Sequence, residues 1–161
     1  MSEIETNKKN LKVYIAAPWA NRTEAQEAQK KFEAAGFEVT AHWITRPSTI
    51  VGDVFAPENA QELTSEAVED IEDIIKSDIF VVLNLDMSEG KATEFGFAYA
   101  LGIPTILVGE RTRNIFYYLS HVFRAKDVEQ VIDGLIEIDQ TKTNLENLVQ
   151  LQEQKEGEVV N

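Results

Sequence analysis

The feature that most constrains the fold is a regular alternation of short apolar, β-branched runs with longer segments of helix-forming residues. The apolar runs span 11–17, 37–43, 79–85 and 104–109, with a weaker one at 121–125. The helical segments between and after them span 21–35, 58–76, 91–102 and 126–138. Short apolar runs bounded by turn residues indicate buried strands. Strands that alternate with helices form a parallel sheet with right-handed crossovers, so the pattern predicts an α/β fold.

The five predicted strands fit one doubly wound, flavodoxin-like parallel sheet of order 2-1-3-4-5 with flanking helices. Ligands of such sheets bind beyond the carboxyl ends of the strands, which directs attention to the residues after each strand. We expect a flexible N-terminus over 1–10, one domain over 11–138 and a helical tail over 139–161. The segment 44–57 contains two prolines and a glycine, and its length suits a binding loop or lid.

Charge and composition exclude several classes of function. The chain has 28 acidic against 15 basic residues and a net charge of −13, so its surface repels nucleic-acid polymers. No apolar run approaches the roughly 18 residues of a membrane span, and we expect no membrane partner. The absence of cysteine excludes disulfides and thiolate metal sites, and a cytoplasmic protein is the simplest expectation.

Glu94 is the most unusual residue in its surroundings. It is the only acidic residue between Gly90 and Gly109, in a helix that is apolar nearly all round. We therefore expect that helix to be packed inside, where a carboxylate is costly unless it is paired or functional. The alternative is a carboxylate stabilised by the dipole at the helix N-terminus.

A second carboxylate, Asp70, lies at the edge of the apolar stripe of the helix over 58–76, whereas Glu66, Glu69 and Asp73 are expected to face solvent. Taken alone, a solvated acid is the simpler interpretation of Asp70. Two carboxylates on separate helices that border one cleft are nevertheless what glycosidic bond cleavage requires. One attacks the anomeric carbon or stabilises positive charge there, and the other handles the proton of the leaving group.

The remaining candidates are weaker. Ser88 and Gly90, before and at a helix start, suit a small anion, although Ser88 equally suits a helix cap. Trp19 is placed to stack on a base or to cover the core. His42 and His121 are isolated, and we expect neither a metal nor a cofactor, since metal-ligand, phosphate-loop and dinucleotide motifs are missing.

Three stretches, VYIAAPW, VEDIEDIIKSD and SEGKATEFGFAYALG, resemble the nucleoside 2-deoxyribosyltransferase family, which includes 2′-deoxynucleoside 5′-monophosphate N-hydrolases. The resemblance covers about residues 11 to 135. It implies that Glu94 is a nucleophile forming a covalent deoxyribosyl ester, that Asp70 exchanges a proton with the base, and that Tyr14 hydrogen-bonds the nucleophile. It also implies a nucleoside or nucleoside monophosphate, together with a free base, as small-molecule partners.

The same resemblance assigns binding residues. Trp19 matches an aromatic near the base, and His42 is expected on the same side. Asn114, within R-N-I-F at 113–116, matches a segment that a neighbouring subunit contributes, which implies a homo-oligomer. Ser88 replaces an aspartate of the transferases, as in the monophosphate hydrolases. Two features depart from the family pattern. Ala92 replaces a second glycine of the loop, and Ala20 and Asn21 lie where the hydrolases have an arginine after the first strand, with Arg22 just beyond.

Transfer to a second base and hydrolysis remain equally open. Two further readings stay open beside this enzyme: a non-catalytic nucleotide-binding or sensing module on the same fold, and an interaction protein that uses the acidic face and the C-terminal helix. A pure binding module has no need of a buried carboxylate, which favours the enzyme.

Overall fold

The computed structural model describes residues 11–112 and 114–141, which form one five-stranded parallel sheet in the order β2-β1-β3-β4-β5. This confirms the predicted topology. The strands are β1 (Lys12–Ala16), β2 (Glu38–Val39), β3 (Ile79–Leu83), β4 (Thr105–Val108) and β5 (Val122–Ala125). The predicted flexible N-terminus over 1–10 and the part of the tail beyond residue 141 lie outside the described residues.

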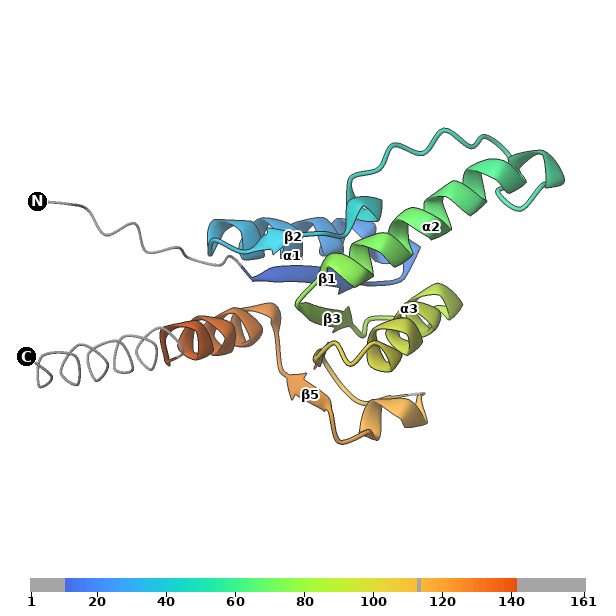
Figure 1. Ribbon diagram of the computed structural model, residues 1–161. Coiled ribbons are helices and arrows are strands. Elements are labelled where there is room, and N and C mark those ends of the chain that lie inside the picture. The colour runs from blue at the N-terminus through green and yellow to red at the C-terminus, as the bar shows by residue number, and fades with distance from the viewer. Residues whose placement is uncertain (1–10, 113, 142–161) are drawn as a thin grey trace, which may run out of the picture.

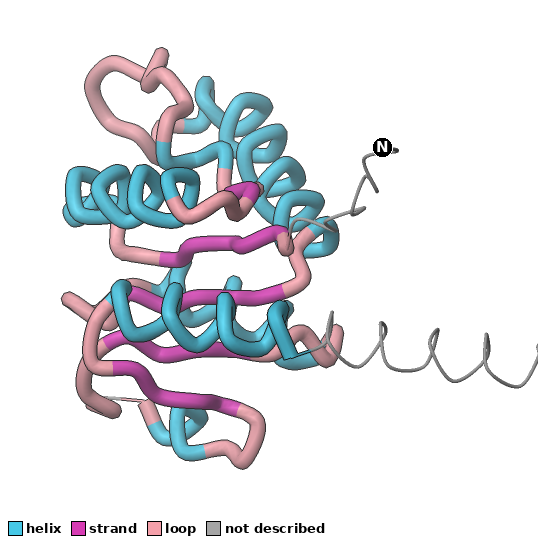
Figure 2. Tube along the Cα trace, turned by 90° about the vertical axis from the view of Figure 1, so that its left-hand side faces the viewer, coloured by secondary structure: helices cyan, strands magenta, loops and turns pink. Residues whose placement is uncertain are grey.

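Helices cover both faces of the sheet (Figures 1 and 2). The helices are α1 (Arg22–Ala34), α2 (Ala60–Lys76), α3 (Glu89–Ala100) and a helical segment at 128–141. On one face α2 packs against α3. On the other, an ion pair of 2.6 Å between Lys31 and Glu129 joins α1 to the segment 128–141. None of the helices in the described part is both long and apolar enough to cross a membrane.

The centre of the core lies between β1 and β3, whose side chains are almost completely buried. Tyr14 of β1 and Phe80 of β3 are register partners, and their rings stack with centroids 5.3 Å apart. A strand flanked by other strands and covered on both faces needs apolar residues at successive positions, which is the pattern of residues 79–83.

Gly36 ends α1 in the way the sequence predicts for a glycine just past a helix. Its φ of +92° is a left-handed conformation that favours glycine. The amide of Phe37 donates to the carbonyl of Phe32 and the amide of Gly36 to that of Glu33, each at 3.0 Å. The rings of Phe32 and Phe37 then meet edge to face, which directs the chain into β2.

The predicted strand over 37–43 is wrong in its second half. Only Glu38–Val39 form β2, and His42–Ile44 form a 3-10 turn, η2. The backbone turns because Trp43 and Ile44 are more stable inside than on an edge strand. The indole Nε1 of Trp43 donates to the carbonyl of Ile15 at 2.9 Å, which satisfies its one polar atom.

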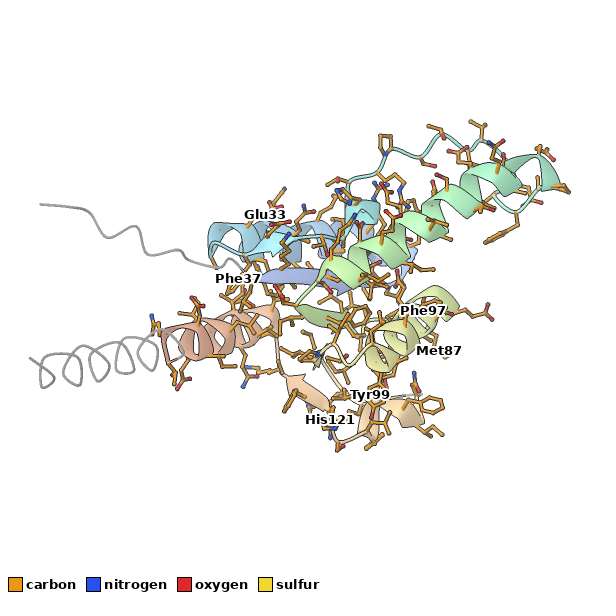
Figure 3. All side chains as sticks on the ribbon, in the orientation of Figure 1. Glu33, Phe37, Met87, Phe97, Tyr99 and His121 are labelled. Atoms are coloured by element: carbon orange, nitrogen blue, oxygen red, sulfur yellow. The ribbon has the colours of Figure 1, made fainter. Side chains whose placement is uncertain are left out.

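The expectation that the helix around Glu94 is packed inside on all sides is also wrong. Phe95 and Ala98 of α3 are buried, but Phe97 is 42% and the C-terminal flanking residue Leu101 is 54% exposed. Figure 3 shows Phe97 and Met87 at the same end of the molecule, on and beside α3. Part of the apolar surface of α3 is therefore buried in this chain, and part of it stays exposed to solvent.

Candidate active site

Tyr14 and Glu94 form the centre of the candidate site. The phenol Oη of Tyr14 donates a hydrogen bond of 2.6 Å to Oε1 of Glu94, across 80 positions of sequence. Tyr14 comes from β1 and is fully buried, while Glu94 comes from the second turn of α3 and is half-buried. The structure thus brings together Tyr14 and Glu94, the two residues that the family resemblance pairs.

The surroundings of Glu94 make its ionisation costly. Burial, reinforced by the nearby charge of Asp70, raises its pKa from 4.5 to about 7, and the hydrogen bond from Tyr14 opposes that rise. Burial and the charge of Glu94 raise the pKa of Tyr14 far above its ordinary value, so the phenol remains a donor. A carboxyl of this kind ionises near neutral pH, as a catalytic group requires.

Asp70 is on α2, which packs against α3; its side chain is partly buried and close enough to Glu94 for its charge to act on that carboxyl. Burial raises the pKa of Asp70 above its ordinary value, and Arg46 opposes this by donating from Nη2 to Oδ1 at 2.7 Å. Within the described residues Oδ2 of Asp70 accepts no hydrogen bond. One oxygen is therefore anchored and the other is available.

Arg46, which the sequence did not single out, joins several acids of α2. Its guanidinium contacts Glu69, with Nε 2.8 Å from Oε2, and lies 3.9 Å from Glu66. The expectation that these two glutamates simply face solvent is therefore wrong. From α1, Arg22 Nε donates to the carbonyl of Ile44 at 2.7 Å and its Nη2 donates to the carbonyl of Arg46, which fixes the start of the loop.

Asp73 is the clearest failure of the sequence interpretation, which assigned it to solvent. It is 1% exposed and accepts three contacts from His42: the backbone N–H at 3.0 Å and Nδ1 at 2.9 and 2.8 Å from its two oxygens. The contact exists because η2 turns the chain back onto α2. Its only signal in the sequence is the spacing of three from Asp70, which places both acids on one face of a helix.

Trp19 follows β1 and is 56% exposed. The guanidinium of Arg22 lies 4.7 Å from the centroid of its ring, and the ring is tilted against Trp43 at 6.2 Å. An exposed indole supported by a cation and a second aromatic offers a flat apolar surface at the carboxyl end of the sheet.

Ser88 caps α3, since its Oγ accepts from the amide of Lys91 at 3.2 Å, and Gly90 lies exposed in the first turn. Beside this turn is a cavity of about 530 Å³. Residues that line it include Asn84, Ser88, Lys91, Thr112, Asn114 and Tyr117. Glu94, Asp70 and Tyr14 do not line it, so within one chain Asn114 borders the helix start rather than the carboxylates.

Lys91 was also missed. It is only 3% exposed, and its Nζ donates to Asn84 Oδ1 at 3.0 Å and to the carbonyl of Asp86 at 2.6 Å. Burial lowers its pKa. Its spacing with Phe95 and Ala98 on the inner face of α3 was the available signal. Among the described residues, no three histidine, aspartate or glutamate side chains gather as metal ligands would.

Comparison with known proteins identifies the family. The sequence matches the model described as nucleoside 2-deoxyribosyltransferase over residues 13–161. Among solved structures it is similar to that of a CMP N-glycosidase, BcmB, from Clostridium botulinum, with 18% identity, 77% of this chain and 97% of that chain covered, and a TM-score of 0.45. No curated protein matches the sequence. Because the family match extends over nearly the whole chain, this protein belongs to the nucleoside 2-deoxyribosyltransferase family, whose activity is cleavage or transfer at an N-glycosidic bond.

Proposed function

We propose that this protein cleaves the N-glycosidic bond of 2′-deoxynucleosides or their 5′-monophosphates through a covalent deoxyribosyl ester on Glu94. The observation that carries the proposal is the short hydrogen bond from Tyr14 to a half-buried Glu94 whose pKa lies near 7. A nucleophilic carboxylate must be partly desolvated to attack and must be held in one orientation. Burial supplies the first condition and the hydrogen bond from Tyr14 the second.

In the first step an oxygen of Glu94 attacks C1′ of the sugar, and the electron pair of the C1′–N bond leaves with the base. Asp70 donates a proton to the departing base, for which its raised pKa is suited. In the second step the oxygen of water, or a nitrogen of another base, attacks C1′ and releases the Glu94 carboxylate. Asp70 recovers a proton from that nucleophile. Because each displacement inverts C1′, the two together retain its configuration.

The placement of the substrate follows from the groups around the two carboxylates. The base lies toward Trp19 and His42, where an exposed indole and imidazole are available. The 5′ end lies toward Ser88, Gly90 and the first turn of α3, whose amides favour an anion. The neutral Ser88 and the buried ammonium of Lys91 both favour a 5′-phosphate over a free hydroxyl.

The same proposal includes a homo-oligomer in which Asn114 reaches the site of a neighbouring subunit. Residues 115–118 form a 3-10 turn, η4, next to Asn114. Three of its large side chains are exposed: Ile115, Phe116 and Tyr118. Large apolar side chains gathered at one surface favour burial against a second copy. Sedimentation of the intact protein tests the assembly, and a monomer at all concentrations would contradict it.

The reaction is tested by mass spectrometry of incubations with each deoxynucleoside and each deoxynucleoside monophosphate, with and without a second free base. Free base from monophosphates alone establishes hydrolysis of nucleotides, whereas exchange of bases on nucleosides establishes transfer. Glu94→Ala should abolish both. Wild-type turnover in Glu94→Ala would contradict the assignment of Glu94 as the nucleophile. If the wild-type protein formed no product from any of these substrates, the proposed enzyme activity would be contradicted.

A further inference from the structure

The imidazole of His42 is held at one edge and open at the other. Its side chain is 64% exposed, although Nδ1 contacts a carboxylate that is 1% exposed. The bound edge therefore points into the protein, and the exposed edge is the one that contains Nε2. The backbone N–H of His42 donates to the same carboxylate, so Asp73 fixes both the ring and the turn from which it projects.

The chemistry of this contact selects one tautomer. An ionised carboxylate only accepts hydrogen bonds, so the ring nitrogen that faces Asp73 must hold a proton. In the neutral imidazole only one nitrogen is protonated, and Nε2 then has a free lone pair. A histidine without such a partner is not restricted in this way.

The pair lies beside the proposed base site. Asp73 follows Asp70 by one turn of α2, and its charge contributes to the raised pKa of Asp70. Arg46, four residues after His42, contacts Asp70 as His42 contacts Asp73. Asp70 and Asp73, one turn apart on α2, are thus each bound by one residue of the segment 42–46. Asp73 therefore lies next to Asp70, the proposed acid for the base.

We infer that Asp73 is a positioning residue that holds His42 as its Nδ1–H tautomer, so that Nε2 accepts a hydrogen bond from an N–H group of the nucleobase. This inference rests on the proposed function. It assigns a preference for bases with an exocyclic amino group, such as cytosine and adenine. A carbonyl at the same place, as in uracil or hypoxanthine, faces Nε2 with lone pair against lone pair.

Nitrogen-15 NMR of the intact protein at about pH 8, above the ordinary range of imidazole, measures the tautomer directly. The chain has 2 histidines, so exposed His121 is the internal reference. We expect His42 to show a protonated Nδ1 and an unprotonated Nε2. A protonated Nε2 with a bare Nδ1 would overturn the inference, and this measurement does not depend on any enzyme activity.

Selectivity is measured as the ratio of kcat/KM for a cytosine substrate to that for its uracil analogue, at the same pH. His42→Phe keeps a planar ring without the acceptor and should lower the ratio on the order of tenfold. Asp73→Asn, which preserves volume but removes the charge, should lower it in the same direction. The matched control is Glu72→Gln, an exposed acid of α2 that pairs only with Lys76 among the described residues.

The outcomes separate the inference from the proposed function. An unchanged ratio in His42→Phe or Asp73→Asn, with both variants unfolding at the wild-type temperature, overturns the assignment of base selectivity. If Asp73→Asn proves unstable, the ratio in His42→Phe and the wild-type tautomer still decide it. Failure of every substrate to react removes the proposed function and with it the role in selectivity, whereas the tautomer stands or falls by NMR alone.

Discussion

The phenol of Tyr14 donates to the carboxylate of Glu94 at 2.6 Å, and this is the contact that favours the ionised form of the carboxylate where burial disfavours it. The side chain of Tyr14 contacts both the core and the candidate site. Its ring stacks on Phe80 in the core, and its hydroxyl ends at the site. The orientation of the Glu94 carboxyl is therefore coupled to a fully buried tyrosine of the central strand β1.

Tyr14→Phe tests this coupling through the pH dependence of kcat/KM. The proposed reaction needs ionised Glu94, so in the wild type kcat/KM should rise with pH along an acidic limb centred near pH 7. The hydrogen bond lowers the pKa of Glu94, so its loss should move this acidic limb to higher pH and reduce the rate at neutral pH. Tyr99→Phe, on α3, is the control. An acidic limb that stays in place in Tyr14→Phe contradicts the coupling.

Glu94→Gln should increase stability while it removes activity. The folded-state pKa of about 7 lies above the ordinary 4.5, so ionisation opposes folding, and wild-type stability falls as the pH rises between these values. At pH 8 the glutamine variant should be more stable by up to about 3 kcal/mol, with a smaller difference at pH 5. Urea unfolding at both pH values measures this. A gain that is equal at the two pH values would assign the effect to packing instead.

Arg46→Gln should change both stability and the proton affinity of Asp70. Removal of the cation leaves Glu66, Glu69 and Asp70 facing one another, at a cost of about 2 kcal/mol in unfolding free energy. Because Arg46 lowers the pKa of Asp70, its loss raises that pKa and should move the alkaline limb of kcat/KM upward. Lys76→Gln, which removes an exposed lysine of α2, should change neither the stability nor the alkaline limb. An unmoved alkaline limb means that Asp70 is not the acid.

Ser88→Asp distinguishes the two classes of substrate. Aspartate caps a helix as well as serine does, so α3 should keep its start. The added negative charge repels a 5′-phosphate, and kcat/KM for monophosphates should fall at least tenfold, whereas the value for nucleosides should not. Ser88→Asn, a neutral cap, is the matched control. Equal losses on both substrates would place the 5′ end elsewhere.

The strand order and the unusual position of Glu94 follow from residue patterns, whereas Tyr14 and Asp70 were assigned to the site through the family resemblance. The order follows from apolar runs that only buried parallel strands need, as at 79–83. Glu94 stood out because its neighbours along the chain are apolar. Asp73 and Arg46 did not, because their environment is created by η2, a turn that forms only when Trp43 and Ile44 enter the core. Contacts made by a short 3-10 turn leave no period in the sequence.

The exposure of α3 was missed for a related reason. An apolar helix is buried somewhere, but the sequence does not say whether the cover comes from its own chain. Phe97 and Leu101 remain exposed here, and the exposed side chains of η4 are likewise large and apolar. The expectation of a fully enclosed helix around Glu94 assumed one chain, whereas the proposed homo-oligomer needs two.

The most direct measurement is peptide mass spectrometry of the protein quenched with acid during turnover of a 2′-deoxynucleoside monophosphate or nucleoside. We predict a peptide containing Glu94 that is heavier by one deoxyribosyl group, with its 5′-phosphate where the substrate has one. The adduct should be absent from Glu94→Gln, which should also lack turnover. A sugar adduct on another residue, or a Glu94→Gln variant that reacts at the wild-type rate, would show that Glu94 is not the nucleophile.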